Sequence, residues 1–572
     1  MLSGRRSSIL QRDADRCSLV CRWSAPGWQQ QLRRLLPTVS RTGREDAGAG
    51  DKLAPGVSCK LVLVRLKLPT RVSLQKTFVF AAIFFCIQQL EHTGLVFSLL
   101  YFAFVILSVV AFNIAEGFSR ISGAYIFWYS TLIVMFGVTW KALVGEPADS
   151  NLFTPVLDMS LYTASMVMLV LVTHLNKKMD FRSIGVASGF SIADLNYTSA
   201  GLGCLIVWLG IIYADMVFGQ APGSIVSALV QVNVFGPLGL IMVTIGAIKD
   251  SGGRRATNTI SILAFIYFFY LGLMSFSKQA MLTPMICWIV GAFYSRLKVR
   301  WVHVVMMLLM VIVSFMVVSP LSASRDLAEG LDDTQRLEFV GHMLLHYSQL
   351  REHVKGLEET AESNGVGEWY NKPQGSLVER LSMVPVDDEL IAYSAKGHYE
   401  GLAPLYQYFG NLAPHFINPN KGGFYGGNYY AHEMGYGLAE GDYSTGISFS
   451  PVAEAFHCEG WGGILWLMPT IWVLLFSSVD FVVGDIMKYP WGLMVVVWFG
   501  HLVPEQLLGG MIYFLGNGNF GMVLAIILVT RIAPILGALF MGKTVLPPAR
   551  RPASIRRVVP QARGSAGLST LY

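Results

Sequence analysis

Apolar runs of about the length needed to cross a bilayer divide this chain and leave it little choice of fold. A helix needs about 20 apolar residues to span a membrane, where every backbone polar group must be bonded within the segment. Only 14% of the 572 residues are charged, against about 25% in soluble proteins. The sequence therefore predicts an all-α polytopic integral membrane protein with about twelve transmembrane helices. The predicted spans are 74–90, 94–112, 121–143, 156–175, 199–218, 224–248, 257–276, 280–294, 301–319, 461–483, 490–508 and 520–541.

Basic residues between these spans predict their orientation. If the N-terminus is cytoplasmic, every cluster of Lys or Arg between spans falls on the inside, as the positive-inside rule requires. These inside residues are Arg120, Lys177, Lys178, Arg182, Lys249, Arg254, Arg255, Arg296, Lys298, Arg300 and Lys488. Both termini are then predicted to be cytoplasmic.

One long stretch, residues 320–460, is polar. It holds 20 of the 37 acidic residues and 7 of the 11 histidines. The alternation of spans places it outside, as one large loop of mostly helical and irregular structure. We expect amphipathic helices within 332–362, a further helix over 376–393, and an irregular Gly- and Tyr-rich segment over 404–446. Titratable groups gathered in one such loop indicate chemistry at a membrane surface.

The same pattern predicts five regions. We expect residues 1–72 to be a basic, disordered N-terminal region, 73–319 the first membrane block, 320–460 the large outside loop, 461–541 the last membrane helices, and 542–572 a basic cytoplasmic tail. Fifteen of the 43 Lys and Arg precede Thr77, and six follow Phe540. Basic tails on a membrane protein are typical of contact with anionic lipid, so we expect a lipid bilayer and no nucleic acid as partner.

Two motifs look like cofactor sites and are rejected. Residues 537–544 fit the phosphate-loop pattern GxxxxGK[ST], but they end a membrane helix and run into Pro547, whereas the true motif joins a strand to a helix. His342 and His346 are spaced to share one helix face, yet no third metal ligand accompanies them. The sequence predicts no metal and no other cofactor.

The end of the polar loop carries the most specific pattern in the chain. A Ser/Thr-rich run leads to Ser, then Glu-x-aromatic, then Gly-aromatic-x-Gly at the start of a membrane helix. The residues concerned are Ser450, Glu454, Phe456, Gly460, Trp461 and Gly463. This pattern resembles that of bacterial O-antigen and exopolysaccharide repeat-unit polymerases (Wzy type). Cys458 and Glu459 depart from the Asn and Phe expected there.

Two shorter stretches are similar to the same family. Residues 414–421 match its Pro-x-x-x-x-Pro-x-Lys stretch, although His415 stands where Arg is common. Ser277 and Lys278 match its Ser-(Arg/Lys) signal at an external helix end. The resemblance covers about 50 residues in letters and residues 75 to 540 in architecture.

The resemblance implies polymerisation of undecaprenyl-pyrophosphate-linked oligosaccharide repeat units at the periplasmic face of the bacterial inner membrane. A sugar hydroxyl of the acceptor attacks the anomeric carbon of the donor, and lipid pyrophosphate leaves. Such a glycosyltransferase uses no nucleotide sugar. The lipid-linked glycan is the expected partner, and the resemblance suggests a chain-length regulator and a flippase besides.

Pyrophosphate needs fixed cations and the attacking hydroxyl needs a general base. The predicted bases are Glu454, Asp442 and His432, with Glu440 as a further acid. The predicted substrate-binding residues are Arg380, Arg325, Lys278, Lys421 and Tyr430. Simpler roles stay open, because Arg325 and Arg380 adjoin acids with which they can form surface ion pairs, and a carboxylate at Glu454 suits a helix N-terminus.

Three other functions remain possible from sequence. An O-antigen ligase uses the same donor, although the His-Asn dipeptide typical of ligases is missing near Glu454. A secondary transporter suits the number of spans but usually has charges at the bilayer midplane. A cell-wall glycan polymerase has the same broad shape.

Overall fold

The structure is a computed structural model that describes residues 64–218, 226, 229–230, 233–328, 330–363, 370, 381–413, 424–435 and 447–542. Most of the predicted N-terminal region and all but the first residue of the predicted C-terminal tail lie outside the described residues. Among those described, the regular elements are helices, apart from an isolated bridge between Arg65 and Lys298. The predicted all-α fold is therefore confirmed.

The first membrane block contains eleven described α-helices, some of them parts of one longer segment. They are α3 (Leu74–Leu90), α4 (Leu95–Ile114), α5 (Ile121–Trp128), α6 (Phe136–Val144), α7 (Pro155–Met179), α8 (Tyr197–Phe218), α10 (Phe235–Asp250), α11 (Thr259–Met274), α12 (Lys278–Tyr294), α13 (Trp301–Val313) and α14 (Ser319–Ala323). The last block contains α21 (Met468–Val483), α22 (Gly492–Glu505), α23 (Leu507–Tyr513), α24 (Asn519–Ile527) and α25 (Ala533–Phe540).

Seven of the described helical segments are long and apolar enough to cross a membrane. They are Leu95–Ile114, Ile121–Val144, Pro155–Gly189, Tyr197–Phe218, Trp301–Ser322, Gly463–Val483 and Leu507–Phe540. Shorter apolar helices coincide with three more predicted spans, at Leu74–Leu90, Thr259–Met274 and Gly492–Glu505. A membrane protein is thus supported, and the count of about twelve spans stays a prediction.

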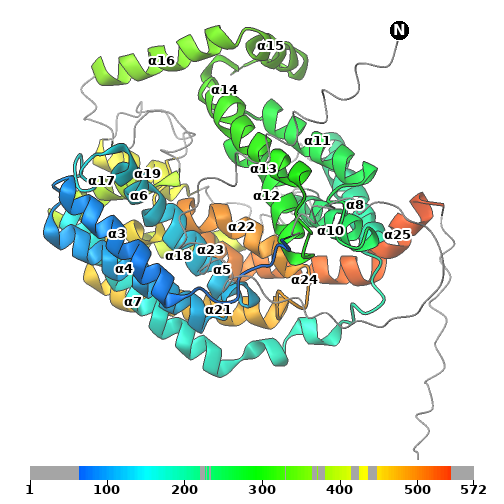
Figure 1. The fold of residues 1–572 in the computed structure, drawn as a ribbon, viewed down its shortest axis with the longest axis horizontal. Helices are drawn as coiled ribbons and strands as arrows, with labels where there is room; N and C mark the ends of the chain where they lie inside the picture. The colour runs from blue at the N-terminus through cyan, green and yellow to red at the C-terminus, as the bar shows by residue number, and fades with distance from the viewer. Residues whose placement is uncertain are drawn as a thin grey trace, which may run out of the picture. The chain divides into compact units, whose positions relative to one another are not determined.

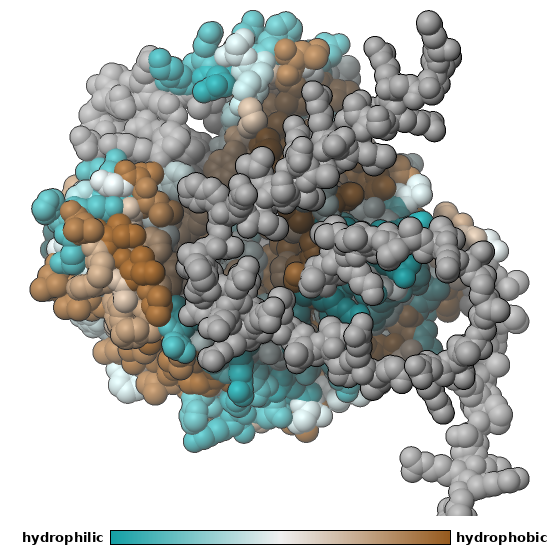
Figure 2. Space-filling view, in the orientation of Figure 1, coloured by the Kyte–Doolittle hydropathy of each residue, from teal (hydrophilic) through white to brown (hydrophobic). Residues whose placement is uncertain are grey.

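Large apolar side chains cover the outer faces of several of these helices. Phe78 on α3, Leu99 on α4 and Leu308 on α13 are each more than half exposed. Soluble proteins rarely expose apolar surface of this extent, whereas lipid tails cover it at no cost. Figure 2 shows hydrophobic residues over α3 and α4 and hydrophilic ones gathered over α15 and α16.

Inside, one apolar core joins the two membrane blocks. Helix α7 packs against α4 and α21, and α8 packs against α10 and α25, so segments from both ends of the described chain lie side by side (Figure 1). A second apolar cluster joins the ends of α11 and α12 to the polar region through Phe276, Met281, Leu321 and Val340.

The helix ends divide into two groups that lie at opposite ends of the bundle. Arg120, only 1% exposed, pairs with Asp180 at 2.8 Å and with Asp480 at 3.1 Å. This cluster joins the end of α4 to the ends of α7 and α21. At the other ends of α4 and α7, the backbone near Gly94 and Thr154 is bonded by Asp149 and Asp388. The polar region therefore docks where the predicted outside loops meet.

The polar region is more helical than predicted. The expected amphipathic helices are present as α15 (Asp333–Leu345) and α16 (Tyr347–Ser363), and Asp332 caps α15 through Thr334 and Gln335. The sequence predicts a further helix over 376–393. Of this range the structure describes the residues from 381 onward, and the helix there is α17 (Val384–Ala395). The irregular segment predicted over 404–446 is wrong where it is described, because α18 (Ala403–Leu412) and α19 (Gly426–Met434) are helices.

Close packing explains why glycine occurs in α19. A Cβ atom at Gly426 would lie 2.2 Å from the Tyr408 hydroxyl, and one at Gly427 would lie 1.8 Å from the Ile447 carbonyl oxygen. These glycines therefore serve helix contacts, although glycine costs a helix about 1 kcal/mol relative to alanine. The glycines that led us to predict a loop are therefore explained by the close approach of α19 to its neighbours.

Helix α20 (Pro451–Glu459) leads into the last membrane block through a π-helical turn at Gly463–Leu467. Gly460 between them has φ +54°, a conformation that favours glycine. A Cβ atom at Gly463 would lie 1.7 Å from the Ala455 carbonyl oxygen. The two motif glycines thus allow α20 to fold tightly against the start of the next membrane helix.

We predict that Gly463→Ala lowers stability by about 1–3 kcal/mol, because the added methyl group meets backbone that cannot move aside. The measurement is thermal unfolding of the detergent-solubilised protein, followed by size-exclusion chromatography. Gly462→Ala is the matched control, since a Cβ atom there meets only the Glu459 side chain at 3.8 Å. Equal melting temperatures for the two variants would contradict the proposed close approach.

Candidate functional site

Two adjacent carboxylates on α17 fasten the polar region to the membrane helices. Asp388 accepts hydrogen bonds from the backbone N–H groups of Phe153 at 2.6 Å and Thr154 at 2.7 Å, where α7 begins. Asp387 accepts from the Ser450 N–H at 2.7 Å and from the Tyr162 hydroxyl at 2.6 Å. Helix starts have unbonded N–H groups that suit carboxylates, so this carboxylate clasp, Asp387 and Asp388, joins α17 to α7 and α20.

Helix α20 is held by a third buried carboxylate, Glu454, which has no exposed surface. One oxygen accepts from the hydroxyls of Tyr408 and Tyr430, each at 2.7 Å. The other accepts from the Leu508 N–H at 2.5 Å, at the start of α23. Leu507 has φ +55°, and this break between α22 and α23 leaves the next N–H free to donate. Glu454 therefore gathers α18, α19 and α23 around α20.

Helices α19 and α20 are joined by a second contact one turn further along. Tyr430 contacts Glu454, and Glu433 contacts His457 with 3.3 Å between the carboxylate oxygen and Nε2. Both pairs are three residues apart on their helices, so they lie on the same helix faces. The contact between Tyr430 and Glu454 thus sets the positions of Glu433 and His457.

His457 lies at the centre of an acid–histidine cluster, which we define as Glu400, Glu433 and His457. Their potential ligand atoms all lie within 4.8 Å of one another. The His457 side chain is fully buried, and that of Glu433 is 25% exposed. The Glu400 N–H donates to the His457 carbonyl oxygen at 3.1 Å, and the Tyr429 hydroxyl donates to the Glu400 carboxylate at 2.8 Å. The cluster therefore opens to solvent only on its carboxylate side.

Burial shifts the titration of these groups. It lowers the pKa of His457, against the opposing effect of Glu433. It raises the pKa of Glu454, although the two tyrosine hydroxyls and the Leu508 N–H partly offset the shift. It also raises the pKa of Asp387 to about 7. The common cause is that a charged group loses hydration inside the protein.

Aromatic residues on the same elements remain open to solvent. We call Tyr399, Tyr406, Phe409, Tyr425 and Tyr429 the aromatic surface, and their exposure runs from 41% to 74%. Tyr429 bonds to Glu400, and Tyr399 stacks edge-on against Phe456 of α20. Rings next to carboxylates can stack on the apolar face of a sugar while the acids bond its hydroxyls.

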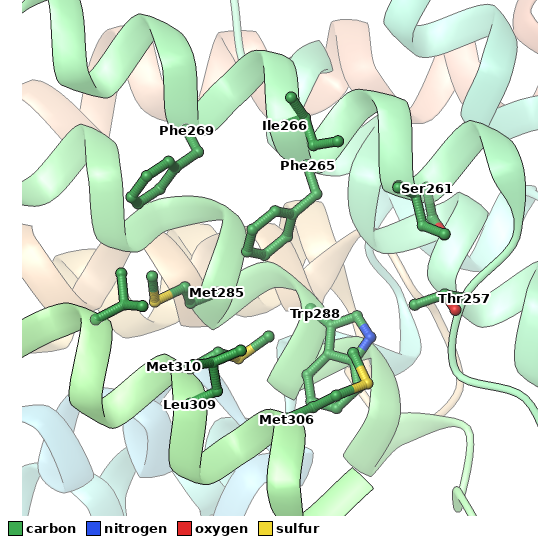
Figure 3. Close-up of a pocket in the computed structure, with 12 residues that line it drawn as sticks. Thr257, Ser261, Phe265, Ile266, Phe269, Met285, Trp288, Met306, Leu309 and Met310 are labelled. Carbon is green, nitrogen blue, oxygen red and sulfur yellow. The ribbon is translucent and has the colours of Figure 1, made fainter. Parts of the chain in front are cut away.

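An apolar cavity of about 350 Å³ lies between α11, α12 and α13 (Figure 3). Thr257 and Ser261 lie at one end of it, where α11 begins, and the other lining residues are apolar. The larger apolar ones are Phe265, Phe269, Met285, Trp288, Met306 and Met310. This composition suits a hydrocarbon chain and offers almost no partner to a polar ligand.

The structure separates the predicted site residues into groups. Glu454 and Tyr430 are fully buried and bonded to each other. In this conformation they position α20 and α19, and neither side chain has surface open to solvent. His432 is partly buried on α19, next to Glu433.

The predicted cations are less completely described. Lys278 begins α12, and exposed Arg325 follows α14; both elements belong to the second apolar cluster, at one end of the bundle. Arg380, Lys421, Asp442 and Glu440 lie outside the described residues.

Sequence reasoning missed the carboxylate clasp and the acid–histidine cluster. Three consecutive acids, Asp387 to Glu389, within an otherwise apolar helix were the available signal for the clasp. No spacing signalled the cluster, because its members come from three separate segments. Comparisons with protein-family models, curated proteins and solved structures gave no match.

We predict that the Asp387 carboxyl makes stability depend on pH. Its folded pKa of about 7 exceeds the ordinary 3.8, so its contribution is complete at low pH and is lost as pH rises through about 7. The melting temperature in detergent should fall as pH rises from about 4 to about 7 and should level off above that. Asp387→Asn should reduce this fall, and Glu389, whose pKa burial also raises to about 7, should preserve part of it. An unchanged slope in the variant would contradict the assignment.

We also predict that Glu454→Gln destabilises the protein by about 1–3 kcal/mol, because an amide cannot accept all three hydrogen bonds and leaves a buried donor unsatisfied. Thermal unfolding in detergent measures this. Glu459→Gln, an exposed acid on the same helix, is the control and should melt like the wild type. If both variants melt alike, Glu454 is not the anchor of α20.

Proposed function

We propose that this chain is a glycosyltransferase that polymerises undecaprenyl-pyrophosphate-linked oligosaccharide repeat units into O-antigen or exopolysaccharide at the periplasmic face of a bacterial inner membrane. The observation that carries the proposal is the acid–histidine cluster with the exposed rings of Tyr399 and Tyr429 beside it, fastened to one end of the membrane helices. A lipid-linked glycan presents its sugars at that level while its tail stays in the bilayer.

The aromatic surface suits the sugar part of such a substrate. Tyr406 and Tyr425 are 74% and 71% exposed, so their rings are open to a partner. The Tyr429 hydroxyl bonds to the Glu400 carboxylate, and hydroxyl and carboxylate groups of this kind can bond sugar hydroxyls. A transporter would instead need its polar groups near the bilayer midplane.

The reaction transfers a glycosyl group between two lipid-linked substrates. An acceptor hydroxyl oxygen bonds to the donor's anomeric carbon, the bond from that carbon to the pyrophosphate oxygen breaks, and a base takes the hydroxyl proton. The leaving group carries the bonding electrons and needs positive charge nearby. Lys278 and Arg325, at the same end of the bundle, and Arg380 and Lys421 are the proposed sources.

The apolar cavity supports the lipid part of the proposal. A polyprenyl chain is branched and flexible, and the methionines and aromatic rings that line the cavity adapt to irregular hydrocarbon. The cavity lies between the apolar helices α11, α12 and α13 (Figure 3), and we propose that the lipid tail occupies it.

Extension of a purified lipid-linked repeat unit tests the proposal directly. With purified protein and no nucleotide sugar, we expect a ladder of products that differ by one repeat unit. Single-unit transfer to a lipid A core acceptor would instead identify a ligase. No reaction with either acceptor would reject glycosyl transfer from this donor.

In a polymerase-null strain, we expect Arg380→Ala to leave lipid A carrying one repeat unit or none at normal protein level. Loss of a charge-assisted hydrogen bond to pyrophosphate, worth about 1.5–3 kcal/mol, corresponds to about 10- to 100-fold less polymer. Arg351→Ala is the control, because Arg351 is exposed on α16 in the same region. Full-length polymer from Arg380→Ala would remove that residue from the site.

A further inference from the structure

We propose that Glu400, Glu433 and His457 bind one divalent transition-metal ion of the zinc type. The inference concerns the metal site alone and does not depend on the proposed glycosyl transfer. It begins with the bonding of the fully buried His457 ring, which fixes the nitrogen that carries the proton.

The Ser394 hydroxyl determines the tautomer of His457. Its oxygen lies 2.6 Å from the Leu390 carbonyl oxygen and 2.9 Å from the His457 Nδ1 atom. A hydroxyl has one proton, and a carbonyl oxygen can only accept. The Ser394 proton therefore bonds to Leu390, and Ser394 accepts a hydrogen bond from Nδ1–H of His457. When the ring is neutral, its lone pair is therefore on Nε2.

That lone pair faces an acid. Nε2 lies 3.3 Å from a Glu433 carboxylate oxygen, and without a proton between them both atoms are acceptors. Metal-binding histidines typically show this arrangement, in which the remote nitrogen donates to a fixed protein group and the near nitrogen faces the ion. Ser394 serves as that fixed group here, because α17 is held by the carboxylate clasp.

The charge of the cluster favours a divalent ion. Two carboxylates converge on one imidazole, with all potential ligand atoms within 4.8 Å. An imidazolium neutralises only one of the two acids, whereas a divalent cation neutralises both and leaves the ring neutral. Metal–ligand bonds of about 2.0–2.2 Å require the donor atoms to come somewhat closer together, and the flexible glutamate side chains allow this movement.

The donor set also selects the metal. One imidazole nitrogen and two carboxylates suit Zn²⁺ and, more weakly, Mn²⁺, whereas Mg²⁺ prefers oxygen ligands throughout. Three protein ligands leave a fourth position of a zinc ion open. That position faces the solvent side of the cluster, since Glu433 is partly exposed and His457 is not. If the proposed function holds, a pyrophosphate oxygen could occupy it.

The test is metal binding by the full-length protein in detergent. After dialysis against Zn²⁺ and removal of the excess, mass spectrometry of the elements should give one zinc per chain. Co²⁺ substitution should give the visible absorption of a tetrahedral site. Glu433→Gln should weaken Zn²⁺ binding at least about tenfold, and because Glu433 is at the surface this variant should fold. Mg²⁺ should bind more weakly than Zn²⁺.

Glu505→Gln is the matched control. Glu505, whose side chain is 30% exposed, also forms a pair with a histidine, His501, at 3.0 Å, but belongs to no described group of three ligands. It should bind Zn²⁺ like the wild type. Zinc should also raise the melting temperature of the wild type and of Glu505→Gln, and should not raise that of Glu433→Gln. Equal zinc affinity for wild type and Glu433→Gln would overturn the proposal and leave Glu433 and His457 as an ion pair.

Discussion

Three buried carboxylates hold the polar region in place, and the arrangement of its helices depends on how these carboxylates are bonded. A buried carboxylate is tolerated only when hydrogen bonds replace its lost hydration. Asp388 and Glu454 find those donors at the starts of α7 and α23, both in membrane segments. Asp387 finds one at the start of α20. The hydrogen bonds that these acids require therefore hold the helices of the polar region at one end of the membrane bundle.

The hydrogen bonds of Glu454 also position the acid–histidine cluster. Tyr430 and Glu454 lie three residues before Glu433 and His457 on α19 and α20, so the first pair aligns the second pair on the same faces. Within the second pair, His457 is fully buried and Glu433 is 25% exposed. The anchoring contact and the acid–histidine cluster therefore occupy successive turns of the same two helices.

The motif that suggested a polymerase is largely explained by this packing. Ser450 caps α20, Glu454 bonds three neighbouring elements, Gly460 takes a positive φ and Gly463 passes close to backbone. Such residues tie the polar region to a membrane helix whatever that region does. The motif therefore supports a shared architecture more strongly than it supports a specific chemical role for Glu454.

The sequence by itself determined the membrane helices, because hydrocarbon length and backbone hydrogen bonding leave an apolar run of 20 residues few alternatives. It also located the polar region and its amphipathic helices by periodicity. It could not show that α19 is a helix, since the glycines of α19 are required by close contacts with Tyr408 and Ile447. Nor could it assemble Glu400, Glu433 and His457, which only the packing of separate segments brings within 4.8 Å. Sequence patterns reflect interactions between residues a few positions apart, whereas tertiary structure decides which distant side chains come together.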